Sequence, residues 1–179
     1  MKKILLRDES VYTDTVKHVK IDRAFLKEDL LFSSLITHDR MDPRSLRPGY
    51  HDFKIKGSQA LTWLMDYVRD HFRIETKRTL MTQSVWGNLL SPREHTIKRN
   101  HALDKDPPDY IMLYGIDVEK GSSDLIIEYD REVNYKNNLI RLPLNDNVFH
   151  LFPAHLNYYI SMNKGNQINC FLTVGCELG

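Results

Sequence analysis

The sequence predicts a mainly β protein of the α+β class, a β-sandwich or jelly-roll barrel with two N-terminal helices packed on one sheet. Apolar residues recur at helical spacing within the first 76 residues, whereas short apolar runs fill the rest of the chain. Turn signals such as EKGSS and NKGN separate these runs, a pattern typical of strands in sandwiches and barrels. The change of pattern near Lys77 therefore marks the passage from helices to barrel.

Length and composition limit the classes of protein and partner. With 179 residues the chain is expected to form one domain, with an N-terminal arm and helices over 1–76 and the barrel over 77–179. A net charge of +1 gives no reason to expect nucleic acid as a partner. No apolar run approaches the roughly 20 residues that span a bilayer. The N-terminal stretch MKKILLRDES is too short for a signal-peptide core, which favours the cytoplasm or a particle assembled there.

Two amphipathic helices are expected before the barrel. Asp22 is placed to cap the first, which runs from Arg23 to about Ile36 and whose apolar face would hold Phe25, Phe32, Leu35 and Ile36. The second begins at Ser58, and its broad apolar stripe consists of Ala60, Leu61, Leu64, Met65, Val68 and Phe72. Because such a helix buries one face, we expect it on the outside of a sheet.

Two other segments carry weaker patterns. Residues 1–20 are compatible with a strand or an arm around Val11 to Val19. The stretch from Thr37 to Phe53, THDRMDPRSLRPGYHDF, holds two prolines, a glycine and charges of both signs, which predicts a long ordered loop or arm. Long loops in compact domains are commonly functional, so both segments are candidate contact surfaces.

Four sequence features carry a resemblance to a known family. They are GYHDF before an amphipathic helix, Trp86-x-Asn88, the strand–turn–strand from Tyr110 to Asp130, and Phe152-Pro153 before the last hairpin. With these features the chain resembles the small 2-oxoglutarate/Fe(II)-dependent oxygenases of tailed phages. The resemblance implies a double-stranded β-helix, the jelly-roll barrel of those enzymes.

The same resemblance implies where a metal site would lie. Enzymes of this kind hold iron with two histidines and one carboxylate and pair the cosubstrate with a cation. The family pattern places Arg99 and His101 at the first two ligand positions, Tyr158 at the third and Gln167 at the cosubstrate position. An arginine cannot ligate a metal, because it stays protonated. We therefore expect a degenerate metal site.

Two alternatives keep a metal site open. A three-histidine site would combine His101 with His95 and His155, which lie close in sequence to the expected ligand positions. In an active oxygenase of this kind, Arg141 or Gln167 would meet the cosubstrate.

The principal hypothesis is a non-catalytic, oxygenase-like jelly-roll protein that serves as a structural or adaptor component of a tailed-phage virion. It predicts no cofactor, other virion proteins as partners in a homo- or hetero-oligomer, no membrane or nucleic-acid partner, and a place in a virion assembled in the host cytoplasm. The alternative is an oxygenase that hydroxylates a protein or a small molecule with Fe(II) and 2-oxoglutarate. A jelly roll that binds a sugar or another ligand without metal is a third possibility.

Overall fold

A computed structural model describes residues 1–6, 9–17, 21–38, 50–55, 57–102, 104–131 and 137–179. In chain order the elements are β1 (Lys2–Leu6), β2 (Glu9–Thr15), α1 (Arg23–His38), β3 (Tyr50–Lys54), α2 (Gln59–Thr76), β4 (Leu80–Leu90), β5 (Tyr110–Asp117), β6 (Asp124–Arg131), β7 (Asn137–Pro143), β8 (Val148–Pro153), β9 (Asn157–Ile160) and β10 (Asn169–Leu178).

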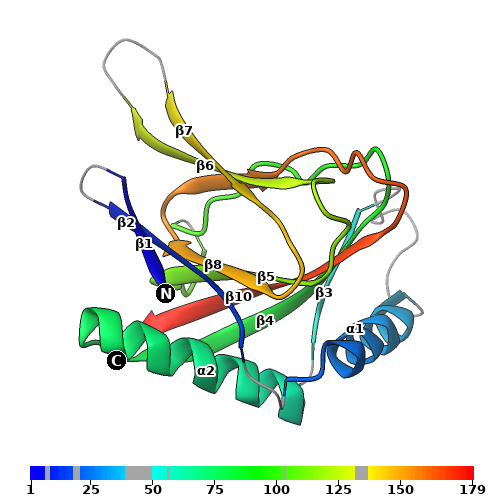
Figure 1. Cartoon of the computed structure of the whole chain (residues 1–179), viewed down its shortest axis with the longest axis horizontal. Coiled ribbons are helices and arrows are strands. Elements are labelled where there is room, and N and C mark those ends of the chain that lie inside the picture. The colour runs from blue at the N-terminus through cyan, green and yellow to red at the C-terminus, as the bar shows by residue number, and fades with distance from the viewer. Residues whose placement is uncertain (7–8, 18–20, 39–49, 56, 103, 132–136) are drawn as a thin grey trace.

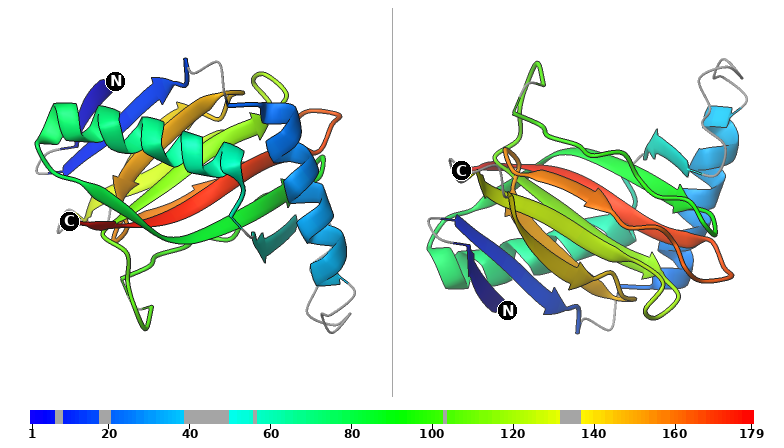
Figure 2. Two further views of the ribbon diagram at one scale, coloured as in Figure 1. Left: turned by 90° about the horizontal axis from the view of Figure 1, so that it is seen from below. Right: turned by 90° about the horizontal axis from the view of Figure 1, so that it is seen from above.

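The strands form two sheets that face each other, and both helices lie on the outer side of the larger sheet (Figures 1 and 2). The larger sheet has the order β1-β2-β8-β5-β10-β4-β3 and the smaller one the order β7-β6-β9. All strand pairings are antiparallel. The predicted fold class, a jelly-roll barrel with two N-terminal helices packed on one sheet, is confirmed.

Helix α2 agrees with its sequence pattern in detail. The Ser58 hydroxyl accepts a hydrogen bond from the Leu61 amide, and Lys77 closes the helix in the left-handed conformation with φ 63°. The six residues of the predicted apolar stripe are the six that the helix buries. The position of the stripe against the large sheet follows from the 3.6-residue period alone.

Helix α1 begins where predicted but buries a different face. The Asp22 carboxylate accepts hydrogen bonds from the amides of Ala24 and Phe25, as a capping residue should. The predicted apolar face is wrong at Phe25 and Phe32, which are 49% and 66% exposed, and the side chains of Leu35 and Ile36 lie outside the described part of the structure. Leu26 and Leu30 are buried instead. These leucines are four residues apart and form a narrow apolar stripe on one side of the helix. The phenylalanines dominated the hydrophobic pattern of the sequence, so the stripe was not predicted.

The N-terminal segments contribute more to the sheet than their sequence suggested. The prediction of a strand or an arm around Val11 to Val19 is confirmed in part, because β2 covers Val11 to Thr15, while residues 18–20 lie outside the described part of the chain. The sequence did not indicate β1, which forms an antiparallel hairpin with β2 on one edge of the large sheet. Of the predicted Thr37–Phe53 loop, residues 39–49 lie outside the described part of the chain. Its last residues form β3, which pairs with β4 on the opposite edge.

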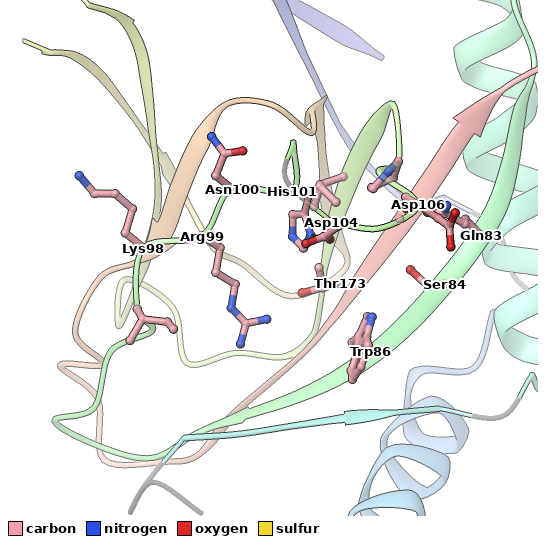
Figure 3. Close-up of a pocket in the computed structure, with 14 residues that line it drawn as sticks. Gln83, Ser84, Trp86, Lys98, Arg99, Asn100, His101, Asp104, Asp106 and Thr173 are labelled. Carbon is pink, nitrogen blue, oxygen red and sulfur yellow. Dashed lines mark hydrogen bonds and ion pairs between the residues drawn. The ribbon is translucent and has the colours of Figure 1, made fainter. Parts of the chain in front are cut away.

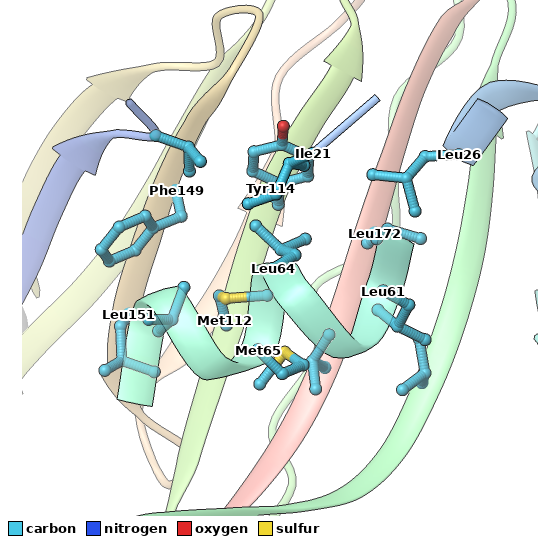
Figure 4. Close-up of a cluster of buried hydrophobic side chains, with 14 of the residues drawn as sticks. Ile21, Leu26, Leu61, Leu64, Met65, Met112, Tyr114, Phe149, Leu151 and Leu172 are labelled. Carbon is cyan, nitrogen blue, oxygen red and sulfur yellow. The ribbon is translucent and has the colours of Figure 1, made fainter. Parts of the chain in front are cut away.

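Two apolar clusters stabilise this arrangement. One lies between the helices and the outer side of the large sheet, where Leu64 and Met65 of α2 meet Met112, Tyr114 and Leu172 (Figure 4). The second fills the space between the two sheets. Within the described residues, neither helix is long and apolar enough to cross a membrane.

Candidate functional site

Residues 96–99, between β4 and β5, run beside β9 of the small sheet and are joined to it by an isolated bridge. Arg99 and Tyr158 form an antiparallel bridge, with the Arg99 amide 2.8 Å from the Tyr158 carbonyl oxygen and the Tyr158 amide 3.0 Å from that of Arg99. The amide of Thr96 donates to the carbonyl of Ile160, two residues further along β9. Because residues directly opposite each other share one face of a sheet, Arg99 and Tyr158 lie on the same face.

Side chains of this segment alternate between two directions. The Asn100 amide group bonds the His155 carbonyl and the Asn157 side chain, and Lys98 forms an ion pair with Glu128, so both turn to the rim. Arg99 and His101 extend the other way, towards the large sheet (Figure 3). This is the period of two that an extended strand imposes.

Arg99 and His101 open onto a pocket of about 640 Å³ at the mouth of the barrel. The pocket lies between residues 97–101 and 104–108 on one side and the inner face of β4, β5 and β10 on the other (Figure 3). Its lining combines polar and apolar surface in similar measure. It consists of Gln83, Ser84, Trp86, Ile97, Lys98, Arg99, Asn100, His101, Asp104, Asp106, Pro108, Ile111, Thr173 and Gly175.

The polar wall formed by β4 and β10 is held by a buried amide. Asn88 is fully buried, and its side-chain nitrogen donates to the Thr173 hydroxyl at 3.0 Å and to the carbonyls of Trp86 and Phe171. Trp86 and Thr173 stand opposite each other in the β4–β10 pairing. Asn88 therefore fixes the strand positions that carry both pocket residues.

A glycine keeps the same wall open near the rim. A Cβ atom at Gly175 would lie 2.7 Å from the Ser84 hydroxyl oxygen, closer than side-chain atoms approach in practice. A larger residue there would displace Ser84, which also lines the pocket. Glycine at this position therefore preserves the space in front of both strands.

His101 is held between two side chains. Its Nδ1 lies 2.7 Å from the Asp104 carboxylate and its Nε2 lies 2.9 Å from the Tyr158 hydroxyl. Since a carboxylate only accepts, Nδ1 carries the hydrogen, and in the neutral ring Nε2 accepts from Tyr158. The Tyr158 ring is buried and packs edge-on against Phe152, with 5.0 Å between the ring centroids. The imidazole is therefore oriented from both sides.

The structure does not bring the three candidate histidines together. His101 lines the pocket, whereas His95 is exposed on the connecting segment. His155 is 54% exposed and pairs with Glu9 at 3.2 Å. Closeness in sequence therefore did not become closeness in space, because only His101 of the three lines the pocket.

Neither candidate cosubstrate residue reaches the pocket. Arg141 is 61% exposed on β7, where it pairs with Asp124 at 3.6 Å. Gln167 is exposed in the turn before β10, and its backbone amide donates to Glu119. The pocket residues that sequence reasoning did not select are Gln83, Ser84, Asp104, Asp106 and Thr173. The period-two alternation of side chains in β4 and β10 could have identified Ser84 and Thr173, because it places both on the inner face of the sheet.

Comparison with known proteins gives a clear answer for the fold and none at the level of sequence. Neither a protein-family profile nor a curated protein sequence matches this chain. Among solved structures, it is similar to the non-heme alpha-ketoglutarate-dependent carbocyclase SnoK from nogalamycin biosynthesis, with a TM-score of 0.70, 7% identity, and coverage of 96% of this chain and 81% of that one. The chain has the jelly-roll fold of the 2-oxoglutarate/Fe(II) oxygenases.

Two other structures share this oxygenase fold. The epimerase SnoN in complex with Fe3+, alpha-ketoglutarate and nogalamycin RO has a TM-score of 0.68 at 10% identity, with 96% of this chain and 80% of that one covered. A Pseudomonas putida prolyl-4-hydroxylase has a TM-score of 0.62 at 12% identity, with 95% of this chain and 93% of that one covered. These similarities contradict our expectation of no cofactor, since they point to iron and 2-oxoglutarate (alpha-ketoglutarate).

The residues at the mouth do not fit the usual iron site of this fold. The described residues contain no group of three or more His, Cys, Asp or Glu side chains placed to hold a metal ion. His101 supplies one nitrogen donor, while Arg99 and Tyr158 stand at the other two positions assigned by the family resemblance. The pocket therefore lacks the two-histidine, one-carboxylate set and carries a fixed cation beside its one histidine.

Proposed function

We propose that the chain binds a carboxylate cosubstrate of the 2-oxoglutarate class at the barrel mouth. Hydroxylation of a protein or small molecule with Fe(II) and 2-oxoglutarate is the activity to test first. The observation that carries this proposal is the pocket of about 640 Å³, lined by both polar and apolar side chains, at the open end of an oxygenase fold. A cavity of that size accommodates a small organic acid. Its lining supplies hydroxyl, amide and cationic groups, which recognise carboxylates.

The lining also explains how a small ligand would be fixed. Trp86 provides a flat wall on β4, and Ser84 and Thr173 provide hydroxyl groups on neighbouring strands. Asn88 and Gly175 keep that wall in place and uncrowded. Recognition of this kind depends on a few placed polar groups in a preformed pocket.

Binding and turnover measured together test the proposal. The protein would be purified anaerobically and reconstituted with Fe(II), and its iron content, 2-oxoglutarate binding and succinate formation would be measured. Saturable 2-oxoglutarate binding supports the carboxylate site, and succinate formation would extend it to oxygenase activity. If no 2-oxoglutarate binds with or without metal, the proposal fails.

A structural or adaptor role in a tailed-phage virion is the second candidate function. It is favoured by Arg99 and Tyr158 at two expected ligand positions and by exposed Phe25 and Phe32 on α1. These two phenylalanines are seven residues apart, so they share one face of the helix, and exposed apolar side chains on one face are typical of contact surfaces. Sedimentation of the purified protein, alone and with other particle components, tests this role. A monomer that binds no particle component would rule it out.

A further inference from the structure

Two large apolar side chains stay exposed inside the pocket. Trp86 of β4 is 38% exposed, and Ile97, on the wall across from β4, is 46% exposed. Among the exposed large apolar side chains of the described residues, these are the two that line the pocket. Apolar surface that a fold leaves open within a cavity favours a ligand that covers it. The pocket therefore offers an apolar slot as well as polar groups.

The indole of Trp86 is left partly uncovered because the residues beside it are small. Thr173 stands directly opposite Trp86 on β10, and Ser84 lies two residues away on the same face of β4 (Figure 3). Gly175, opposite Ser84, adds no side chain to this wall. A flat ring can therefore lie against the indole without displacing another side chain, and aromatic rings favour such an arrangement.

A lysine stands beside Trp86 on its other side. Lys54, the last residue of β3, is exposed and lies directly opposite Trp86 in the β3–β4 pairing. Residues in opposite positions share one face of a sheet, with Cβ atoms about 5 Å apart. Lys54, Trp86 and Thr173 therefore form one row across three neighbouring strands. A ring lying on Trp86 would have an ammonium group along one edge and a hydroxyl group along the other.

The acidic residues of the pocket lie away from this lysine. Asp104 and Asp106 line the pocket on the side where Gln83 lies (Figure 3). The Gln83 side chain donates to the Asp106 carbonyl at 2.9 Å, at a part of β4 that β3 does not reach. Because like charges repel and opposite charges attract, a ligand anion is favoured at the Lys54 side.

From this arrangement we infer that Trp86 and Lys54 form a subsite for a planar aromatic acid. The ring would lie on the indole, on the side that faces Ile97, and its acidic group would meet the Lys54 ammonium. This inference rests on the proposed function, because it places the ligand in the same pocket, and it names the substrate class. The small molecule to be hydroxylated would thus be a flat aromatic acid.

Three probes separate the contributions of ring and charge. They are 2-naphthoate, which is planar and anionic, 2-naphthalenemethanol, which is planar and neutral, and cyclohexylacetate, which is anionic but not planar. Binding of each would be measured by calorimetry at low salt, beside 2-oxoglutarate. Thermal unfolding of every variant confirms that the fold is kept. Wild type should bind 2-naphthoate more tightly than either of the other two probes.

Substitutions of Trp86 test the stacking surface. Trp86→Ala should weaken binding of 2-naphthoate by about three- to tenfold, as expected for the loss of one aromatic contact. Trp86→Phe should stay within about threefold of wild type, because it keeps a flat ring at the same place. Equal binding of 2-naphthoate by wild type and Trp86→Ala would overturn the inference.

Charge reversal tests the lysine. Lys54→Glu should weaken binding of 2-naphthoate by about three- to tenfold at low salt and leave 2-naphthalenemethanol unchanged. The matched control is Lys120→Glu, since Lys120 is exposed in the turn after β5 and does not line the pocket. It reverses the same charge and should change binding by less than about twofold. Equal effects of the two reversals would overturn the role of Lys54.

The parallel measurement with 2-oxoglutarate separates this inference from the proposed function. Binding of 2-oxoglutarate without binding of 2-naphthoate would overturn the inference and leave the proposed function standing. Trp86-dependent binding of 2-naphthoate without any binding of 2-oxoglutarate would do the reverse. No binding of either acid by wild type would overturn both.

Discussion

The two faces of the central strands differ in what they are made of and in what they do. On β10, Cys170, Leu172 and Val174 face the helices and are buried among apolar side chains. The intervening residues face the barrel interior and change from Phe171 to Thr173 to Gly175 towards the mouth. The outer face of β10 is thus uniformly apolar, whereas the side chains on its inner face become smaller and less apolar towards the mouth of the barrel.

This difference shows how one sheet can serve both stability and binding. The outer face is covered by α2, whose burial depends on area and shape rather than on a particular group. The inner face carries individually partnered polar residues, such as Asn88 and His101. Substitutions on the outer face should therefore change the free energy of unfolding, and substitutions at the mouth should change ligand binding.

The largest expected effect is on the outer face. Phe72 of α2 is buried and packs edge-on against Tyr12 and Tyr110, with 5.3 and 5.4 Å between ring centroids. Phe72→Ala should lower the free energy of unfolding by about 3–5 kcal/mol, through lost burial and a residual cavity. Urea unfolding measures this, with Ile74→Ala as the control because Ile74 is exposed on the same helix. A similar loss in both variants would contradict the assigned face.

The inner face also holds a buried histidine on β8. The His150 Nε2–H donates to the Pro143 carbonyl at 3.0 Å, and the Thr13 hydroxyl is 3.0 Å from Nδ1. Burial lowers the pKa of His150 to about 4 from an ordinary 6.5. As pH falls between these values the unfolded chain binds a proton that the folded chain does not, so stability falls.

This linkage predicts a pH dependence with a definite sign. Between pH 6.5 and about 4 the free energy of unfolding should fall by on the order of 3 kcal/mol, at about 1.4 kcal/mol per pH unit. Below that range His150 should cause no further decrease. Urea unfolding of wild type and His150→Gln across this range measures it. Parallel pH profiles for the two proteins would refute the role of His150.

A smaller effect is expected at the polar wall of the pocket. Asn88→Ala removes the donor to Thr173 and to two buried carbonyls, which should cost about 1–3 kcal/mol of unfolding free energy. It should also weaken ligand binding, because Trp86 and Thr173 lose their common anchor. Hydrogen exchange of the β4 and β10 amides, compared with those of α2, would reveal the change. Unaltered exchange in β4 and β10 would count against this anchoring role.

The smallest effect is expected at the rim. Lys98→Ala breaks the ion pair with Glu128, in which Lys98 is about half exposed. Pairs of this kind contribute about 0–1 kcal/mol, so the unfolding free energy should change by less than that. Thermal unfolding at low and high salt is the appropriate measurement. A loss of several kcal/mol would mean that Lys98 has a structural role that its exposure does not indicate.

The parts of the fold that could be predicted are those governed by local periodicity. The stripe of α2, the cap at Asp22 and the succession of strands after Lys77 follow from spacing within a few residues. The burial of Leu26 and Leu30, in contrast, depends on how α1 sits against the sheet. That arrangement is tertiary, and large exposed side chains such as Phe32 mislead a sequence-based assignment.

The site was predictable only in part, for a related reason. The family pattern directed attention to Arg99, His101 and Tyr158, and the bridge between strands brings these three together. Arg141 was chosen by its residue type and Gln167 by the family pattern, but the pairing of β7 and the turn before β10 keep both outside the pocket. Which face a strand residue takes depends on register, and register is set by pairing partners far away in sequence.

The most direct test of the central claim uses the tryptophan of the pocket as its own reporter. The chain has two tryptophans, Trp63 on α2 and Trp86 in the pocket, so Trp63→Phe leaves a single reporter. Titration of this variant with 2-oxoglutarate should give a saturable change in Trp86 fluorescence, and Asn88→Ala in the same background should need a higher concentration for the same change. An unchanged emission of Trp86 would contradict a carboxylate site at the barrel mouth.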